Sequence, residues 1–228
     1  MTHLSIVVPV LNEAQHIAHA LIRLAPLRAR GARVIVVDGG SSDDTRVLAA
    51  PLADLVLSSA RGRAAQMNAG AAAAHGDALL FLHADTKLPA NADALVAAAL
   101  RDRHWGRFDV AIDGAHPMLP VIAAMMNLRS RGSGIATGDQ AIFMRRASFD
   151  RVGGYALIPL MEDIDISKRL KHIGRPACLH AHVTTSGRRW EQHGVWRTIF
   201  LMWRLRLAFF FGADPHALAL AYGYTSKE

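Results

Sequence analysis

The stretch LLFLHADTKLP, residues 79–89, determines how the rest of the chain is interpreted. Residues 78–82 are apolar and predict a buried strand, and His83, Ala84 and Asp85 follow it at once. A histidine and a carboxylate are costly to bury without partners. We therefore expect this strand to end at a site that uses both side chains.

Apolar runs alternate with helical patterns before this stretch. The runs predict strands at residues 4–10, 34–37, 54–58 and 78–82, and apolar spacing predicts helices at residues 13–30, from about residue 43, and at residues 64–74. Such alternation predicts parallel strands joined by right-handed crossovers, which is an α/β sheet with helices on both faces. Ligands bind such sheets at the carboxyl ends of the strands.

Polar residues follow three of these strands. The clusters are Asn12 with Glu13, Asp38 with Gly39, Gly40 and Ser41, and His83 to Thr86. Because the carboxyl ends of parallel strands share one edge, we expect the clusters to meet there and to face a ligand. Each cluster also has an ordinary explanation, since Asn12 or Asp43 could cap a helix and the two glycines could form a tight turn. Their coincidence favours the ligand site.

The second half of the sequence is less regular. Residues 108–112 and 141–145 predict strands and residues 118–131 predict a helix, followed by the loop GSGIATGDQ. This loop composition lets a backbone approach a ligand closely, although ordinary surface loops share it. Further on, Glu162 and Asp163 begin a helix whose apolar stripe contains Ile166 and Leu170. The two carboxylates either favour the helix dipole or supply a general base.

Composition limits the class of protein. With 228 residues, 51% hydrophobic and 20% charged, the chain can bury one full core. The net charge of +7 comes from scattered arginines without a dense basic tract, so we expect no nucleic acid partner and favour an anionic small substrate or a membrane surface. Cys178, the single cysteine, predicts a reducing compartment. The opening MTHLSIVVPVLNEA lacks a basic leader and predicts a cytoplasmic protein.

Seven segments together carry a family resemblance. They are SIVVPVLNEA, VIVVDGGSSDDT, RAAQMNAG, LFLHADT, GDQAIFMRR, MEDIDISKRL and SGRRW. In this order they resemble family 2 glycosyltransferases, which are inverting enzymes with a GT-A fold, and in particular small bacterial members with His-Ala-Asp in place of Asp-x-Asp. The resemblance covers about residues 4–190. It implies one domain with a Rossmann-like nucleotide-sugar half at 1–105, an acceptor and catalytic half at 106–190, and a helical appendage at 191–228.

The resemblance implies a donor site for a nucleoside-diphosphate sugar, with a UDP-sugar favoured. In the family, the aspartate after the second strand binds the base, and here it is Asp38. Arg61 and Arg63, before the third helix, are candidates to hold the diphosphate together with that helix N-terminus. The remaining residues expected to line the donor site are Pro9, Asn12, Glu13, Gly40, Asn68, Ala84, Gly138 and Asp139.

The family's Asp-x-Asp motif holds a divalent cation that bridges the two phosphates. Only Asp85 survives here, with His83 at the first position. Asp85 and the diphosphate could suffice for Mg²⁺, which prefers oxygen ligands, whereas a histidine ligand favours Mn²⁺. His83 could instead hydrogen-bond a phosphate or the ribose. His180 and His182 are further metal candidates or ordinary histidines.

Sugar transfer requires stabilisation of the leaving diphosphate and removal of a proton from the acceptor. The resemblance assigns the base to Asp163, and Glu162 could raise its pKa or hold the acceptor. Asp165 is expected instead to pair with Arg169 on the helix surface. The acceptor could be a lipid, a small metabolite or a saccharide.

Arg189 and Trp190 match the end of the motif by which processive members hold the acceptor. No membrane module follows them, so we expect a non-processive enzyme. Residues 199–211 predict an apolar helix that is too short to cross a bilayer. With Trp196 and Trp203 it could lie at the inner face of a membrane through residues 196–211, pack over the sheet, or form a homodimer.

Two other classes share these features. A nucleotidyltransferase would have a similar sheet and metal, but it usually carries a glycine-rich, basic loop after the first strand, where this chain has PVLNEA. A non-catalytic nucleotide-sugar-binding protein is the second class. A hydrolase that uses water as the acceptor is a variant of the transferase interpretation.

Overall fold

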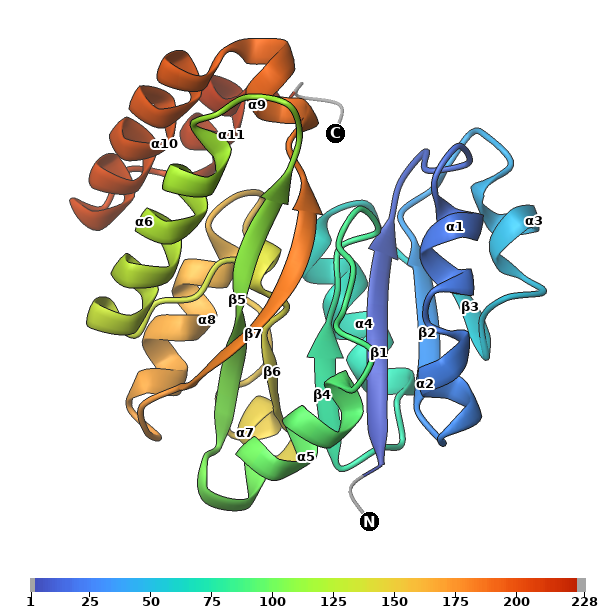
Figure 1. Cartoon of the computed structure of the whole chain (residues 1–228). Helices are drawn as coiled ribbons and strands as arrows, with labels where there is room; N and C mark the ends of the chain where they lie inside the picture. Colours follow the sequence, from blue (N-terminus) through green and yellow to red (C-terminus); the bar gives the residue numbers. More distant parts are fainter. Residues whose placement is uncertain (1–2, 225–228) are drawn as a thin grey trace.

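The computed structural model describes residues 3–224, which form a seven-stranded sheet with helices on both faces (Figure 1). The strand order is β3-β2-β1-β4-β6-β5-β7. The first strands along the chain are β1 (Leu4–Val10), β2 (Arg33–Asp38), β3 (Leu55–Ser58) and β4 (Ala78–Phe81). They pair in parallel, which confirms the predicted α/β architecture of the N-terminal half.

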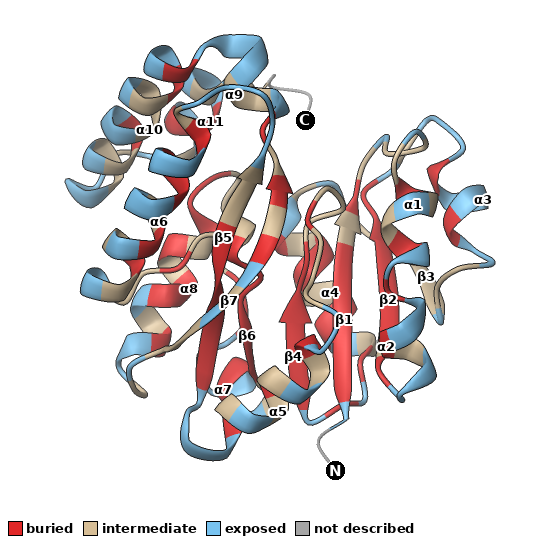
Figure 2. Cartoon of the chain, viewed as in Figure 1, coloured by how far each residue is buried: buried red, intermediate tan, exposed pale blue. Residues whose placement is uncertain are grey.

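The apolar strands β1, β2 and β4 explain why this half folds as it does, because both of their faces are buried (Figure 2), whereas the edge strand β3 is half-exposed. Val7, Ile35 and Leu79 lie in one core cluster with α4 (Arg63–Ala73). The residues that alternate with them lie in the cluster of the other face with α1 (Ile17–Ile22), α2 (Ala25–Ala29) and α5 (Ala92–Asp102).

Two predicted helices differ from the structure. The helix expected at residues 13–30 is split into α1 and α2, because Pro26 in the first turn of α2 has no N–H to continue the earlier helix. The helix expected from about residue 43 is α3 (Thr45–Ala49). Asp43 precedes it, and its carboxylate accepts the Thr45 and Ala14 N–H groups at 3.1 Å each.

The second half completes a mixed sheet. Its elements are β5 (Trp105–Asp113), α6 (Leu119–Ser133), the short 3₁₀ helix η1 (Gly138–Gln140), β6 (Phe143–Arg145), α7 (Arg146–Arg151), α8 (Glu162–Lys171) and β7 (Ala177–Ser186). Strand β6 runs antiparallel to β4 and β5, and β7 runs parallel to β5. A fully buried Arg107 pairs with Asp109, which also pairs with Arg131, and so fixes α6 against β5.

Three helices end the described chain: α9 (Arg188–His193), α10 (Val195–Phe210) and α11 (Pro215–Tyr222). The predicted C-terminal helix is therefore present and begins earlier, at Val195. One face of α10 packs through Leu205 on Met161 and Ile164 of the α8 region. Its first turns join a second cluster with α6 and with Ile112 near the end of β5. Among residues 3–224, no helix is both long and apolar enough to cross a membrane.

Candidate active site

The predicted meeting of the strand ends is confirmed, since β1, β2 and β4 present their carboxyl ends at one edge of the sheet (Figure 1). Glu13 lies there within reach of the charges of Asp85 and Arg188. Burial raises the pKa of Glu13, the Arg188 charge lowers it, and the Asp85 charge raises it again. The net effect is a raised pKa, which reports a crowded acidic edge with one nearby guanidinium.

The loops after β1 and β2 are tied together by short hydrogen bonds. The buried Asp38 carboxylate accepts the N–H groups of Gly40 and Ser41, both at 3.1 Å. Asn12 donates its N–H to the Ser41 hydroxyl (2.9 Å), and its side-chain oxygen accepts the Ser42 N–H (2.9 Å). Asn12 therefore does not cap α1, whose N-cap residue is His16. These hydrogen bonds join the two loops that carry Asp38 and Asn12. We call the joined loops the rim.

Gln66 is a site-forming residue that the sequence interpretation missed. Its buried amide on α4 donates to the carbonyls of Val10 (2.7 Å) and Val37 (2.8 Å), at the ends of β1 and β2. A Cβ at Gly39 would lie 3.0 Å from this amide, so the glycine lets the loop pass close to it. The signal in the sequence was a polar residue on the apolar stripe of α4 between Ala64 and Met67.

Asn68, expected in the donor site, forms two hydrogen bonds with the backbone of Tyr155. Its amide donates to the Tyr155 carbonyl (2.8 Å) and accepts the Tyr155 N–H (2.9 Å). Tyr155 lines a small cavity beside Glu162 and Asp163. This cavity of about 10 Å³ has room for about one water molecule. Asn68 thus supports the wall of the site from α4.

Glu162 and Asp163 begin α8, as predicted, and lie at its N-terminal end. The Asp163 carboxylate accepts the Gly138 N–H (2.9 Å) through Oδ2 and the Ile164 N–H (2.7 Å) through Oδ1. Burial raises the pKa of Asp163 despite these two hydrogen bonds. Burial and the adjacent Asp163 charge raise the pKa of Glu162 to about 7. Near neutral pH the pair can therefore hold a proton, which suits acid–base chemistry.

The raised pKa of Glu162 predicts a pH dependence of stability. The unfolded chain releases this proton near its ordinary value of 4.5 and the folded chain near 7, so folding takes up a proton between those values. The free energy of unfolding is therefore expected to fall as pH rises through that window. Thermal melts across the window should show this slope and should show it flattened in Glu162→Gln. The matched exposed change Asp102→Asn should keep the slope, and an unchanged slope in Glu162→Gln would contradict the assignment.

The contacts of His83 with η1 explain why a histidine follows β4. Its Nδ1 lies 3.4 Å from Asp139 Oδ1, and a Cβ at Gly138 would lie 2.5 Å from the ring atoms Cε1 and Nε2. Burial acts to raise the pKa of Asp139, but His83 and the Arg63 charge hold it below its ordinary value. The ring thus packs on the glycine whose N–H holds Asp163, and it links the end of β4 to the carboxylate pair.

The acidic side chains at this edge could bind a divalent cation only if a bound ligand supplied further oxygens. The Asp85 carboxylate accepts the Thr86 hydroxyl at 3.3 Å, and its charge acts on Glu13. Within residues 3–224, no group of three or more His, Cys, Asp or Glu side chains is arranged to hold a metal ion. Mg²⁺ and Mn²⁺ accept few protein oxygens when phosphate oxygens and water complete the shell. Asp85 fits that role.

Arginines surround the carboxylates. Arg63 begins α4 and is exposed. Although partial desolvation by the surrounding chain acts to lower its pKa, nearby groups including Glu162 and Asp139 hold that pKa above its ordinary value. The sequence interpretation missed Arg129 of α6. Its Nε and Nη2 are buried without a hydrogen-bond partner among the described residues. Burial lowers the pKa of Arg129, although the charges of Asp163 and Asp139 act to raise it. Guanidinium groups with unused donors suit an anionic ligand.

The residues that follow β7 lie partly outside this arrangement. The Arg189 guanidinium stacks on Tyr222 of α11 at 3.7 Å, and its charge also reaches Asp139. Trp190 packs on the apolar cluster of α6 and α10.

Two further candidates from the sequence, Arg61 and His180, lie on other segments of the chain. Arg61 lies in the exposed loop between β3 and α4. His180 sits on the edge strand 3.0 Å from Arg131 and, within the described part of the chain, joins no metal cluster.

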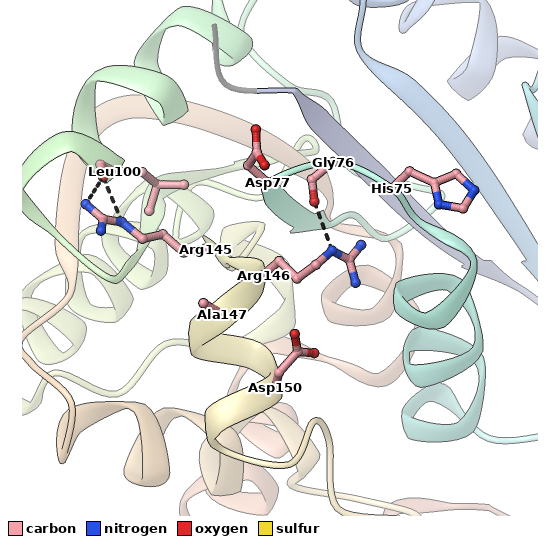
Figure 3. A pocket seen from close by; sticks show the side chains of 8 residues that line it. All are labelled: His75, Gly76, Asp77, Leu100, Arg145, Arg146, Ala147 and Asp150. Atoms are coloured by element: carbon pink, nitrogen blue, oxygen red, sulfur yellow. Dashed lines mark hydrogen bonds between the residues drawn. The ribbon is translucent and has the colours of Figure 1, made fainter.

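A cavity of about 530 Å³ lies at the opposite end of β4 (Figure 3). Two arginines in this cavity bind carbonyls at helix ends. Arg145 donates to the Leu100 carbonyl of α5 (2.9 Å). Arg146 donates to the carbonyls of Gly76 (3.0 Å) and Ala74 (2.7 Å) after α4. Such bonds satisfy carbonyls that a helix C-terminus leaves open. The hollow is therefore structural, and the strand-end edge is the candidate active site.

Comparisons with known proteins identify the family of this chain. The family described as "Glycosyl transferase family 2" matches residues 5–158. The succinoglycan biosynthesis protein ExoA of Rhizobium meliloti (strain 1021) is 51% identical over 49 residues, which are 21% of this chain and 15% of ExoA.

Solved structures share the architecture. The mannosyltransferase PcManGT from Pyrobaculum calidifontis, in complex with GDP-Man and Mn²⁺, is 20% identical with a TM-score of 0.66 over 99% of this chain and 66% of that chain. S. aureus TarS in complex with UDP-GlcNAc is 19% identical with a TM-score of 0.63 over 81% of this chain and 58% of that chain. The likeness confirms the predicted fold, and this chain spans less than two thirds of the length of these relatives.

Proposed function

Since the chain belongs to glycosyl transferase family 2, we propose that this glycosyltransferase moves a sugar from a UDP-sugar to an acceptor with inversion at the anomeric carbon. The observation that carries the proposal is the pair formed by the buried Glu162 and the half-buried Asp163, which Gly138 fixes at the edge where three strands end. In-line attack by an acceptor that a base has activated inverts the anomeric carbon.

The donor would lie along the rim formed after β1 and β2. Asp38 would bind the base, with Pro9, Asn12 and Gly40 lining the pocket, because their loops are tied together around that carboxylate. TarS and PcManGT were solved with UDP-GlcNAc and GDP-Man, which supports a nucleoside-diphosphate sugar as the class of donor.

A divalent cation, Mn²⁺ or Mg²⁺, would be held by Asp85 and would offset the charge of the leaving diphosphate. Arg63 and the N-terminus of α4 would face the same group. His83 is already beside Asp139 and Gly138, so we assign it to positioning the η1 loop rather than to the metal. This role differs from both that the sequence left open for His83, which were a metal ligand and a hydrogen bond to a phosphate or the ribose.

Asp163 would remove the proton from the acceptor, because it is the carboxylate that the loop holds in place. Glu162, with its pKa raised to about 7, would keep a proton for longer and so leave the negative charge of the pair on Asp163. Arg129, with unused donors close to the pair, would bind an anionic part of the acceptor or the diphosphate. The enzyme would act non-processively and, given the lone Cys178, in the reducing cytoplasm.

The test is a donor screen on the full chain. Nucleotide-sugars with different bases and sugars are incubated with Mn²⁺, with Mg²⁺ or with a chelator, and release of the nucleoside diphosphate is measured. We expect metal-dependent release that selects one base, and proton NMR of the product should show an inverted anomeric centre. Release without an added acceptor would indicate a hydrolase. No release and no binding of any donor would leave a non-catalytic protein that shares only the fold.

A further inference from the structure

Two parallel helices, α6 and α10, carry large apolar residues at exposed positions. Figure 2 shows exposed positions along both helices. Trp196, Phe200 and Trp203 are each 63% exposed, and Phe210 is 71% exposed. Their spacing places them on one stripe of α10. On α6, Val121, Met125 and Leu128 are 49–68% exposed at helical spacing. We call these seven residues the α6–α10 face.

The two stripes point to the same side of the molecule. Ile122 of α6 and Val195 of α10 lie in one apolar cluster near the starts of both helices, which run side by side in the same direction (Figure 1). A helix turns about 100° per residue. Val121 precedes the contact residue on α6 and Trp196 follows it on α10, so in parallel helices both project outward on one side. The α6–α10 face is therefore continuous, and a contiguous exposed apolar face marks an interaction site.

The charges on and around the α6–α10 face favour a lipid surface over a second copy of this chain as its partner. Neither helix contains an aspartate or glutamate, and Arg197 and Arg204 of α10 are exposed beside the tryptophans. Aromatic side chains with arginines at their edge match the boundary between headgroups and acyl chains, and anionic headgroups attract the arginines. A second copy of this chain, with its net charge of +7, would bring two arginine-lined faces together and repel.

We propose that the α6–α10 face docks the protein on an anionic lipid surface, with α10 lying in the plane of the interface. The inner side of α10 supports this geometry, because Leu205 packs on Met161 and Ile164, which flank the Glu162–Asp163 pair. A membrane-bound α10 therefore lies directly behind the start of α8. The proposal does not depend on the sugar transfer, since binding to lipid needs neither donor nor metal.

The test is sedimentation of the full chain with vesicles of phosphatidylcholine alone or of equal parts phosphatidylcholine and phosphatidylglycerol. We expect binding to the anionic vesicles that weakens with salt and is much weaker to phosphatidylcholine. Phe200→Ser with Trp203→Ser should lower binding about tenfold or more, because apolar area is lost from the interface. The matched control is Val47→Ser with Leu157→Ser, which removes side chains that are 72% and 74% exposed elsewhere and should leave binding unchanged.

Arg197→Glu with Arg204→Glu should lower binding to anionic vesicles about tenfold or more, whereas the exposed pair Arg46→Glu with Arg151→Glu should have a smaller effect. All variants change exposed side chains, and circular dichroism should confirm their folding. Equal binding by the Phe200–Trp203 variant and the wild type would overturn the proposal, as would equal binding to both vesicles. A dimer in lipid-free sedimentation velocity that the same variant abolishes would instead make this face an interface between copies.

Discussion

Replacing Asp163 with asparagine is expected to lower kcat by about 10²–10⁴-fold, because the acceptor loses its general base. The asparagine side chain has nearly the same volume as the carboxylate, so the cavity beside Glu162 and Tyr155 should keep its shape. The chemical difference is that an amide accepts no proton near neutral pH. Single-turnover rates with the donor from the screen would measure the loss.

The contacts of Asp163 allow the loss of the base to be separated from a disturbed loop. Its two oxygens accept N–H groups from Gly138 and Ile164, and an amide can replace only one of them. A displaced Gly138 would also disturb His83, which packs on it, and so would alter nucleotide binding. We expect the Kd for UDP to stay within a few-fold of the wild-type value, which points to the chemical step.

The matched control is Asp165→Asn, two positions along α8. This carboxylate accepts the Arg169 Nε–H at 2.9 Å on the helix surface, as predicted, and the change carries the same loss of charge. It should leave kcat nearly unchanged. If Asp163→Asn retained wild-type activity, or if both variants lost the same activity, Asp163 would not be the base.

The N-terminal half of the fold could be predicted because its strands are continuous apolar runs that only a sheet covered on both faces can bury. Residues 4–10 match β1 fully, and the other strands predicted in this half match to within one residue at each end. Strand β7 could not be predicted, because its residues are mostly half-exposed and include His180 and His182. The antiparallel direction of β6 also depends on contacts with β4 and β5 that no local pattern encodes.

The same limit applies to the site. Side chains at strand ends, such as Asp38 and Asp85, can be located from sequence because topology alone brings those ends together. The pairing of His83 with Asp139 links residues far apart in the sequence through a close approach to Gly138. Arg129 gave no signal, since one arginine on a helix resembles any other until its buried, unpaired donors are seen.

Replacing Asp85 with alanine is expected to abolish the metal dependence of nucleotide binding. The described acidic groups form no three-ligand metal cluster, so a cation between Asp85 and the diphosphate depends on this one carboxylate. Loss of an outer-shell partner typically costs about 10–100-fold in metal affinity, and loss of a direct ligand should cost at least as much. Calorimetric titration with UDP, GDP and CDP, with and without Mn²⁺ or Mg²⁺, would measure the change.

Asp77→Ala is the matched control, because this exposed aspartate lies just before the other end of β4 and the change removes the same group. We expect it to bind UDP with Mn²⁺ as the wild type does. In Asp85→Ala, UDP should bind weakly and equally with and without metal, through the rim at Asp38 and Asn12. Metal-dependent binding that survived in Asp85→Ala would move the cation elsewhere, and His83 with Asp139, whose Nδ1 and Oδ1 lie 3.4 Å apart, would be the next candidates. His83→Ala would then remove the metal dependence that Asp85→Ala had left intact.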